Sequence, residues 1–473
     1  MAKGDGGAVH ISSTNVKNSP LSVLVENCNF ANNFTKALEG GAMFIEVDGK
    51  VEIKNSRFCN NTANKDGSSG TGSGGAIRFA RANPLIIDGC YFGNNFTKKG
   101  GGAFEIDIAS NRFEVKNTVF VGNTCKDGAD IGAVIYPSGG AVSVPSGYGS
   151  FTNCKFIENT SNSFGGGVSI RNNDRLKLDM PITFDNCEFD GNKSNNGGAI
   201  GQINNKHEVI VTNCVFKNNL AYGLEKASNG GGVLAMSDLC KGLTIKNSTF
   251  TGNTCQGNGG VVWYASGHLI SEGNRFYNNT AYDGGVFYAQ YPSAANNKEL
   301  VSLNDVFYGN SAATVTKKGT GNGGAVYLQM AQPRTVTFTN AVFANNSATG
   351  YTKTRGGGGA IYYLTNSGLL DISGDAKLII DALDNCTFYN NTGIDPTTSK
   401  PSTTAQGADL ESTKKAYSYV KVINSKMQLS LAKYKEYLNF EPDAKTSYSN
   451  TTNPGTAAEA APIDGQGLSL IHI

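Results

Sequence analysis

Charged residues are scarce in this sequence. Only 16% of its 473 residues are Asp, Glu, Lys or Arg, and the formal net charge at pH 7 is +2. A nucleic-acid-binding surface needs a dense basic stripe, so we expect no nucleic-acid partner. Long apolar runs are missing as well. None approaches the roughly 18 residues of a membrane-spanning helix, so we expect no transmembrane segment.

Metal and cofactor motifs are missing too. The sequence has 10 Cys and 4 His, but no Cys-x-x-Cys pair and no histidine that clusters with cysteine, which argues against a zinc site. The calcium-binding pattern Gly-Gly-x-Gly-x-Asp is also absent. We therefore expect neither a metal ion nor a cofactor.

Two short signatures alternate along the chain. The first is Phe-x-x-Asn, the second is Gly-Gly followed by Ala, Val or Gly, and each occurs twelve times. Successive Phe-x-x-Asn units lie 26 to 45 residues apart, a period typical of solenoids and propellers. The Phe-x-x-Asn units begin at Phe30, Phe58, Phe92, Phe120, Phe156, Phe189, Phe216, Phe250, Phe276, Phe307, Phe343 and Phe388.

Each repeat contains short strands and no helical period. After Gly101 and Gly102, the apolar residues Phe104, Ile106 and Ile108 alternate with acidic residues, the pattern of a strand with one buried face. A second short stretch precedes many Phe units, and the Phe unit supplies a third. The shortest repeats leave no room for the four strands of a propeller blade. We therefore predict an all-β solenoid, a single-stranded parallel β-helix of about twelve coils with three short strands each.

The stacking of coils assigns roles to the repeated residues. Coils stack at about 4.8 Å, so we expect the twelve Phe side chains to form one internal ladder. We expect the Asn three residues later to occupy the turn, where Asn tolerates left-handed backbone angles and its amide can bond to amides of neighbouring coils. The glycine pairs mark the other tight corner.

Six cysteines stand two residues before a core Phe. Period two points them inward, and Ser56, Thr118 and Ser248 fill the same position in other repeats, which favours a slot for small buried side chains. Disulfide bonds between neighbouring coils stay open as an alternative, because stacked Cα atoms lie within disulfide range. The six are Cys28, Cys90, Cys154, Cys187, Cys214 and Cys386.

Eleven Asn-x-Ser/Thr sequons occur in the chain. In a sequence so rich in Asn, Ser and Thr, chance alone produces most of them, so they permit N-glycosylation without demonstrating it. These sequons lie at Asn33, Asn60, Asn95, Asn159, Asn192, Asn247, Asn278, Asn345, Asn385, Asn390 and Asn450.

The paired signatures resemble a known repeat. Gly74–Ile77 and Gly197–Ile200 match the Gly-Gly-Ala-Ile element of the chlamydial polymorphic membrane proteins letter for letter, and the Phe-x-x-Asn units match its companion element. The chain resembles this repeat family along residues 4–391. Similar repeats occur in adhesin-like surface proteins of methanogenic archaea and some protists. The resemblance implies a right-handed β-helix at the cell surface that is used for adhesion.

Outward residues of the strands after Gly-Gly offer a candidate binding site. Four consecutive repeats carry an aromatic residue at the same outward position, namely Trp263, Tyr288, Tyr327 and Tyr362. We expect an exposed column of rings that could stack on a glycan or dock a partner protein. The alternative is cross-strand packing that stabilises the sheet.

A polysaccharide lyase or hydrolase of the β-helix fold is the main alternative function, because such enzymes use clustered carboxylates. Here the outward carboxylates Glu46, Glu105 and Asp107 come from different coils without partners in register, so we expect no catalytic site. The favoured interpretation is a non-catalytic extracellular rod, adhesive or structural, whose partner is a cell-surface glycan, a protein or a copy of itself. Head-to-tail assembly into a filament is a further alternative, because an uncapped coil offers unpaired strand edges.

The repeats also set the expected domain boundaries. We expect the β-helix to span residues 1–393, beginning inside a coil, and an irregular final coil or cap to span 394–440. Residues 441–467 have the composition of a low-complexity tail. Residues 468–473 match the translation of a common transposon sequencing adapter and are expected to be an artefact.

Overall fold

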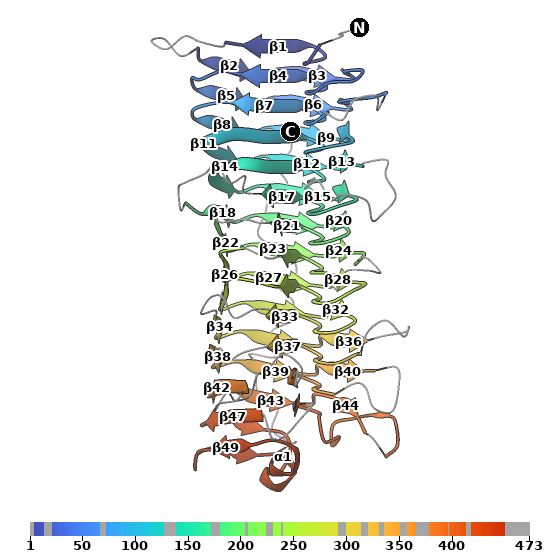
Figure 1. Ribbon diagram of the computed structural model, residues 1–473, viewed down its shortest axis with the longest axis vertical. Helices are drawn as coiled ribbons and strands as arrows, with labels where there is room; N and C mark the ends of the chain where they lie inside the picture. Colours follow the sequence, from blue (N-terminus) through green and yellow to red (C-terminus); the bar gives the residue numbers. More distant parts are fainter. Residues whose placement is uncertain are drawn as a thin grey trace, which may run out of the picture.

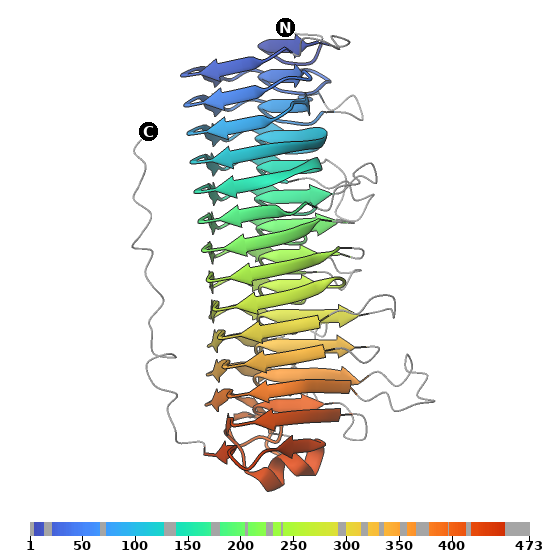
Figure 2. The ribbon, with the colours of Figure 1, turned by 90° about the vertical axis from the view of Figure 1, so that its left-hand side faces the viewer.

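The computed structural model shows a tall stack of parallel strands (Figure 1). Figure 2 shows the coils following one another from the N-terminal end to the helix α1 (Leu431–Tyr437) at the other end. The predicted all-β parallel β-helix is confirmed. The structure describes residues 4–13, 21–66, 72–126, 139–171, 180–203, 207–223, 230–237, 240–291, 299–313, 320–330, 335–350, 357–365, 378–395, 397–412 and 418–449.

A 25-stranded sheet forms two sides of the β-helix. Strands β11 (Phe104–Lys116) and β14 (Val142–Thr152) run through both sides and join them into one sheet. The first side, which follows the Gly-Gly corners, also contains β1 (Val9–Ser12), β4 (Met43–Glu46), β7 (Ile77–Arg81), β17 (Val168–Arg171), β21 (Ile200–Ile203), β25 (Leu234–Met236), β29 (Val262–Tyr264), β33 (Phe287–Tyr291), β37 (Val326–Met330), β41 (Ile361–Thr365) and β46 (Leu410–Ser412). The second side also contains β2 (Val23–Glu26), β5 (Val51–Lys54), β8 (Leu85–Asp88), β18 (Ile182–Asp185), β22 (Glu208–Thr212), β26 (Gly242–Lys246), β30 (His268–Glu272), β34 (Glu299–Leu303), β38 (Thr335–Thr339), β42 (Leu378–Asp384), β47 (Ser418–Ile423) and β49 (Phe440–Pro442).

The core Phe residues lie on the third side, a 14-stranded sheet. It contains β3 (Asn29–Ala31), β6 (Arg57–Cys59), β9 (Tyr91–Gly93), β12 (Val119–Val121), β15 (Lys155–Ile157), β19 (Glu188–Asp190), β23 (Val215–Lys217), β27 (Thr249–Thr251), β31 (Arg275–Tyr277), β35 (Val306–Tyr308), β39 (Val342–Ala344), β43 (Thr387–Tyr389), β48 (Lys426–Met427) and β50 (Ser447–Tyr448). A fourth side has nine strands: β10 (Phe96–Thr97), β13 (Thr124–Cys125), β16 (Thr160–Ser161), β20 (Lys193–Ser194), β24 (Leu220–Ala221), β28 (Thr254–Cys255), β32 (Thr280–Ala281), β36 (Ser311–Ala313) and β40 (Ser347–Thr349). One antiparallel pair, β44 (Gly393–Ile394) with β45 (Pro401–Ser402), lies outside these sheets.

The fourth side corrects the prediction of three strands per coil. Its strands have two or three residues, which is too short for an alternating pattern to show in the sequence. Their inward residues are small, and Ala221, Cys255 and Ala281 form a buried cluster of their own. Such small side chains let the chain pass close to the axis and close the coil.

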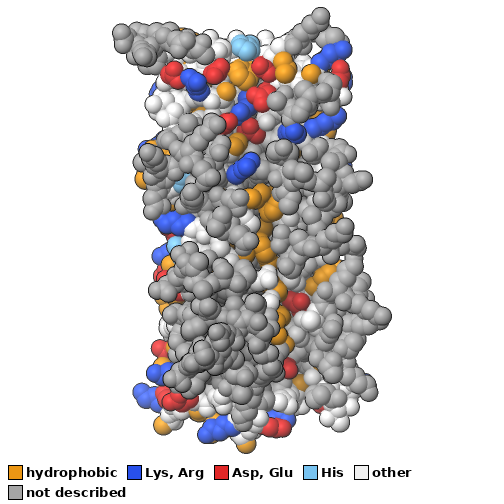
Figure 3. All heavy atoms as spheres, in the orientation of Figure 1, with side chains coloured by type: hydrophobic (Ala, Val, Ile, Leu, Met, Phe, Trp, Pro, Cys, Tyr) orange, Lys and Arg blue, Asp and Glu red, His pale blue; other side chains and the backbone are white. Residues whose placement is uncertain are grey.

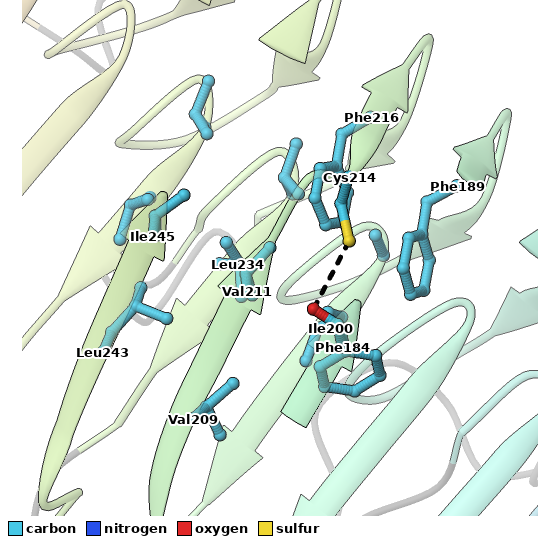
Figure 4. Close-up of a cluster of buried hydrophobic side chains, with 14 of the residues drawn as sticks. Phe184, Phe189, Ile200, Val209, Val211, Cys214, Phe216, Leu234, Leu243 and Ile245 are labelled. Atoms are coloured by element: carbon cyan, nitrogen blue, oxygen red, sulfur yellow. Dashed lines mark hydrogen bonds between the residues drawn. The ribbon is translucent and has the colours of Figure 1, made fainter. Parts of the chain in front are cut away.

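The twelve Phe side chains of the repeats form one continuous internal column. Neighbouring rings stack with centroid separations of 4.6 to 5.3 Å. The strands pair in register, so Phe189 stands opposite Phe156 on one side and Phe216 on the other. Figure 4 shows the rings of Phe189 and Phe216 beside aliphatic residues of the first and second sides.

The repeated Asn residues form a second column, the amide ladder. Asn159 is typical: its backbone N–H and its Nδ2 both donate to Oδ1 of Asn192, at 3.1 and 3.0 Å, and Nδ2 also donates to the carbonyl of Phe120 at 3.1 Å. These bonds satisfy backbone groups that the coil corner would otherwise leave unpaired inside the protein. The ladder comprises Asn33, Asn61, Asn95, Asn123, Asn159, Asn192, Asn219, Asn253, Asn279, Asn310, Asn346 and Asn391.

The left-handed backbone angle falls one residue earlier than predicted. Asn60 and Asn278, which precede ladder residues, have φ of 56° and 52°. The ladder Asn residues themselves do not have positive φ. The expected turn residue was therefore wrong: the preceding residue turns the chain, and this turn directs the next amide into the interior.

The cysteine slot is a hydrogen-bonding slot. Cys214 Sγ donates to the carbonyl of Phe184 at 3.5 Å (Figure 4) and to that of Thr212 at 3.1 Å. Its own N–H donates to Oγ of Ser248, which fills the slot in the next coil, at 3.0 Å. All ten cysteines lie in the described ranges, and none of them forms a disulfide bond there. Burial raises the pKa of Cys386 to about 12, so this thiol stays protonated.

Glycine is required at the corner before the first side. Gly40 has φ of 64°, and a Cβ at Gly41 would lie 2.0 Å from the carbonyl oxygen of Gly75 in the next coil. No side chain fits between backbones at that distance. The glycine pair therefore allows successive coils to turn this corner in register.

Helix α1 closes the C-terminal end. Ser430 caps the helix by accepting from the N–H of Lys433 at 3.3 Å. The Tyr434 ring is fully buried and stacks on Phe440 at 4.7 Å. The strand β50 follows, so regular structure extends past the predicted boundary at residue 440. Residues 450–473, which include the expected artefact, lie outside the described residues.

Two polar residues end the amide ladder at this cap. Gln428 Oε1 accepts from the N–H of Asn391 at 2.9 Å, in the place where another coil would supply Asn. Asp409 accepts from the N–H of Gln428 at 3.1 Å and from the hydroxyl of Tyr434. Burial raises the pKa of Asp409 to about 6, and its hydrogen bonds oppose that shift.

Candidate binding faces

The predicted aromatic column stands in register on the first side. Trp263 pairs with Tyr288, Tyr288 with Tyr327, and Tyr327 with Tyr362. The Tyr288 and Tyr327 rings stack at 4.7 Å, and those of Tyr327 and Tyr362 lie 5.2 Å apart. Figure 3 shows a narrow stripe of hydrophobic side chains along the face that contains this column.

The prediction that these rings are exposed was wrong. Their exposed fractions are only 4 to 8%, and they form a cluster with Ala235 and Ala265. Outward direction does not ensure exposure, because each ring is covered by its neighbours in the stack and by the small residues beside it. The structure thus shows the alternative, cross-strand packing that stabilises the sheet.

The rings of the aromatic column and Asp283 beside them are buried. Burial raises the pKa of Tyr288, and the nearby Asp283 carboxylate adds to that effect. The Tyr288 hydroxyl donates a hydrogen bond to Gln329 Oε1 at 3.0 Å. In the described part of the chain it has no charged hydrogen-bond partner. Asp283 accepts from Thr320 Oγ1 at 2.5 Å and from the N–H of Asn322 at 3.0 Å. Asp283 thus stabilises the chain near a coil corner, and the described rings of the column are too buried to bind a ligand on their faces.

An ion-pair network occupies the N-terminal part of the same face. Arg78 contacts Glu39 at 3.0 Å, Glu105 at 2.9 Å and Asp107 at 3.0 Å. Burial disfavours the charge on Arg78, but the three carboxylates outweigh it and hold its pKa above the ordinary value. Asp107 also accepts from Ser146 Oγ at 2.6 Å.

This network corrects the expectation of dispersed carboxylates. Glu105 stands in register with Arg78 in the neighbouring coil, and Asp107 reaches the same guanidinium. Glu46 lies apart and contacts Arg81 at 3.6 Å. In the described ranges, no group of three or more His, Cys, Asp or Glu side chains could hold a metal ion. The Arg78 network links neighbouring coils through ion pairs, and its Asp107 side chain is 40% exposed.

A second aromatic set lies on the outer face of the third side. Three repeats place Tyr directly after the core Phe, and these residues were not predicted, although the string Phe-Tyr-x-Asn shows them in the sequence. Tyr277 pairs with Tyr308, Tyr308 with Ala344, and Ala344 with Tyr389. We call the outward residues of these four strands the tyrosine face: Arg275, Tyr277, Val306, Tyr308, Val342, Ala344, Thr387 and Tyr389.

Exposed amides flank the tyrosine face along both edges. On one edge, Asn340 Nδ2 donates to Asn304 Oδ1 at 2.9 Å and Asn385 Nδ2 donates to Asn340 Oδ1 at 2.8 Å. On the other edge, Asn390 Nδ2 donates to Asn345 Oδ1 at 2.6 Å. These corner residues form surface rows that run parallel to the internal ladder.

One stretch of the chain matches a known family. Residues 247–264 match the Chlamydia polymorphic membrane protein (Chlamydia_PMP) repeat. The polymorphic membrane protein repeat thus covers the unit with core Phe250, ladder residue Asn253 and the corner at Gly259. The matched stretch therefore contains one member of each ladder and one glycine corner.

The other comparisons add little. No curated protein matches the sequence. A solved structure described as a new PL6 alginate lyase complex with trisaccharide aligns over 90% of this chain and 78% of its own, with a TM-score of 0.36 and 11% sequence identity. A likeness of this size carries no functional argument. In the described part of the chain, no helix is long and apolar enough to cross a membrane.

The fold places the sequons in two environments. Asn95, Asn159 and Asn192 are fully buried members of the amide ladder, and Asn33 belongs to the same ladder. The three fully buried amides cannot carry a glycan in the folded protein, whereas Asn33 is partly exposed. The other described sequons are corner residues: Asn60, Asn247, Asn278, Asn385 and Asn390 are exposed and Asn345 is partly exposed, while Asn450 lies outside the described residues.

Proposed function

We propose that this protein is a non-catalytic rod at the cell surface with an adhesive or structural role. The observation that carries this proposal is the unbroken run of Phe and Asn ladders through twelve repeats. Ladders of this kind fix every coil to the next, which suits a part that must hold its shape and present a long side to a partner. The polymorphic membrane protein repeat supports the surface location.

The state of the acidic residues supports a non-catalytic role. Glu105 and Asp107 are paired with Arg78, and Asp283 is bonded to corner groups. Asp305 accepts from the N–H of Asn274 at 2.7 Å and from Ser302 Oγ at 2.6 Å. Each of these carboxylates is engaged within the fold, whereas an acid or base must reach a substrate.

The cap at α1 favours a single rod over a head-to-tail filament. Tyr434 and Gln428 cover the last coil, so this end does not offer a free ladder to a second copy. Isolated short rods in electron micrographs would agree with this proposal, and fibres with an axial repeat would contradict it.

Surface location and lack of catalysis can be tested separately. Protease treatment of intact cells of the source organism should remove the protein while intracellular markers survive. A panel of neutral and acidic polysaccharides, incubated with and without calcium, should show no new reducing ends and no unsaturated products. Survival on intact cells would overturn the location, and saturable cleavage of any polymer would overturn the non-catalytic role.

A further inference from the structure

The tyrosine face carries partly exposed aromatic rings, unlike the buried column of the first side. Tyr308 and Tyr389 are partly exposed, whereas Ala344, which lies between them in register, is fully buried. The two partly exposed rings therefore lie two coils apart along the rod, on either side of Ala344. Tyr277 packs against Tyr308 edge to face, with centroids 6.1 Å apart, and holds one end of the surface in place.

Charge is nearly absent from this face. Among its eight outward residues, Arg275 is the one charged side chain, and none is acidic. Further toward the N-terminus the same side carries ion pairs, in which Glu188 contacts Lys155 at 3.5 Å and Lys217 at 2.8 Å. A charged partner would lose hydration on binding to the tyrosine face and would find few charges there to pair with. A neutral partner does not lose the hydration of charged groups.

The flanking amides supply both donors and acceptors. An amide has two N–H donors and two acceptor lone pairs. In the row of Asn304, Asn340 and Asn385, each link uses one donor and one acceptor, so hydrogen-bonding capacity remains toward solvent. The row repeats at about the strand spacing of 4.8 Å along the rod. A regular set of neutral polar groups beside aromatic rings suits a polymer that carries many hydroxyl groups.

We propose that the tyrosine face binds a neutral polysaccharide. Its sugar rings would lie on Tyr308 and Tyr389, because aromatic carbons favour the apolar faces of sugars, and its hydroxyls would bond to the amide rows. The assignment rests on the proposed adhesive role and names the class of ligand for it. It also gives a function to the Phe-Tyr-x-Asn strings, which the ladders alone do not require.

Affinity electrophoresis tests this assignment, with mannan, dextran or β-glucan in the gel and polygalacturonate as the anionic comparison. At least one neutral polymer should retard the protein. The variant Tyr308→Ala/Tyr389→Ala should raise the apparent Kd at least tenfold, and Tyr389→Ala alone should raise it at least threefold. Tyr308→Phe/Tyr389→Phe keeps the rings and should bind nearly as wild type. The matched control is Tyr91→Ala, which removes a ring from the same side near the other end.

Three results would overturn the assignment. They are retardation by none of the neutral polymers, retardation by polygalacturonate alone, and wild-type binding by a folded variant that lacks both rings. Adhesion of protein-coated beads to cells separates this site from the broader role. If beads coated with the double alanine variant still adhere fully, the tyrosine face is not the adhesive site, and the adhesive role itself is kept. If beads coated with the wild-type protein do not adhere, but polysaccharide binding still depends on the two rings, then the tyrosine face is a polysaccharide site and the adhesive role is wrong.

Discussion

Asn219 donates its backbone N–H and its side-chain Nδ2 to the same Oδ1 of Asn253, each at 3.0 Å, and both residues are fully buried. The pair is one link of the amide ladder, and it satisfies a corner amide that has no strand partner. The ladder is thus part of the backbone hydrogen bonding of the coil, built from side chains.

Replacement of Asn219 by alanine should destabilise the protein by about 2–4 kcal/mol. The change removes the acceptor for the N–H of Asn192 and leaves that group buried without a partner. Asn218→Gly is the matched control: Asn218 is the left-handed corner residue, with φ of 56°, and glycine accepts this angle without strain. Urea unfolding should show a large loss for the first variant and a change within about 1 kcal/mol for the second. Equal losses would contradict the ladder.

The cysteine slot should accept serine and reject valine. Serine at position 214 keeps the donor to the carbonyl of Phe184 and the acceptor for the N–H of Cys187, which lies 3.3 Å from Sγ. Valine has similar bulk but removes the acceptor for the N–H of Cys187, at a cost of about 1–3 kcal/mol. Thermal unfolding of Cys214→Ser and Cys214→Val measures the difference. If valine is the better tolerated of the two, the slot selects only for size.

Acidification from pH 8 to pH 5 should stabilise the fold through its buried carboxyls. Burial raises the pKa of Asp305 to about 6 and that of Glu411 to about 7, whereas both groups titrate near 4 in an unfolded chain. Between these values the native state holds more protons than the unfolded state, so the free energy of unfolding falls as pH rises through this window.

Asp305→Asn isolates one of these groups. The amide keeps the acceptor for Asn274 but has no charge to bury. At pH 8 this variant should be more stable than wild type by about 2 kcal/mol, and at pH 4 the two should be nearly equal. Chemical unfolding across this pH range gives both curves. Parallel curves would show that Asp305 does not titrate as the structure requires.

Secretion from a glycosylating host should divide the sequons by environment. Glycans should be found only at corner residues such as Asn60, Asn247 and Asn278, which are exposed. Asn159 and Asn192 should remain unmodified in the folded fraction, because their amides bond within the ladder. Peptide mass spectrometry reads each site. A glycan on either ladder residue in folded, soluble protein would place that amide outside the core.

The repeat made most of the fold predictable. Phe189 and Phe216 stand at the same place in their repeats, so stacking coils at the strand spacing puts them in register without knowledge of the loops between them. The same argument predicts that the ladder Asn residues, three positions after each core Phe, also stand in register. Period alone does not say which residue of a corner takes the left-handed angle, which is why the turn was placed on the ladder residue and not on the residue before it.

The outer face was less predictable, because its burial depends on neighbours that differ from coil to coil. Trp263 points away from the core yet is nearly inaccessible, since its own column and the adjoining small residues cover it. The pairing of Arg78 with Glu105 could have been found from the sequence, because both residues stand at the same place after their Gly-Gly corners. Tyr308 and Tyr389 could have been found, because both follow a core Phe directly.

An experimental electron-density map that resolves side chains tests the central claim most directly. It should show the ring of Phe216 between those of Phe189 and Phe250, with centroid separations close to 4.7 and 4.8 Å, and the amide of Asn219 bonded to that of Asn253 behind it. Phe rings distributed among separate pockets, or ladder amides that face solvent, would contradict the β-helix and the rod function built on it.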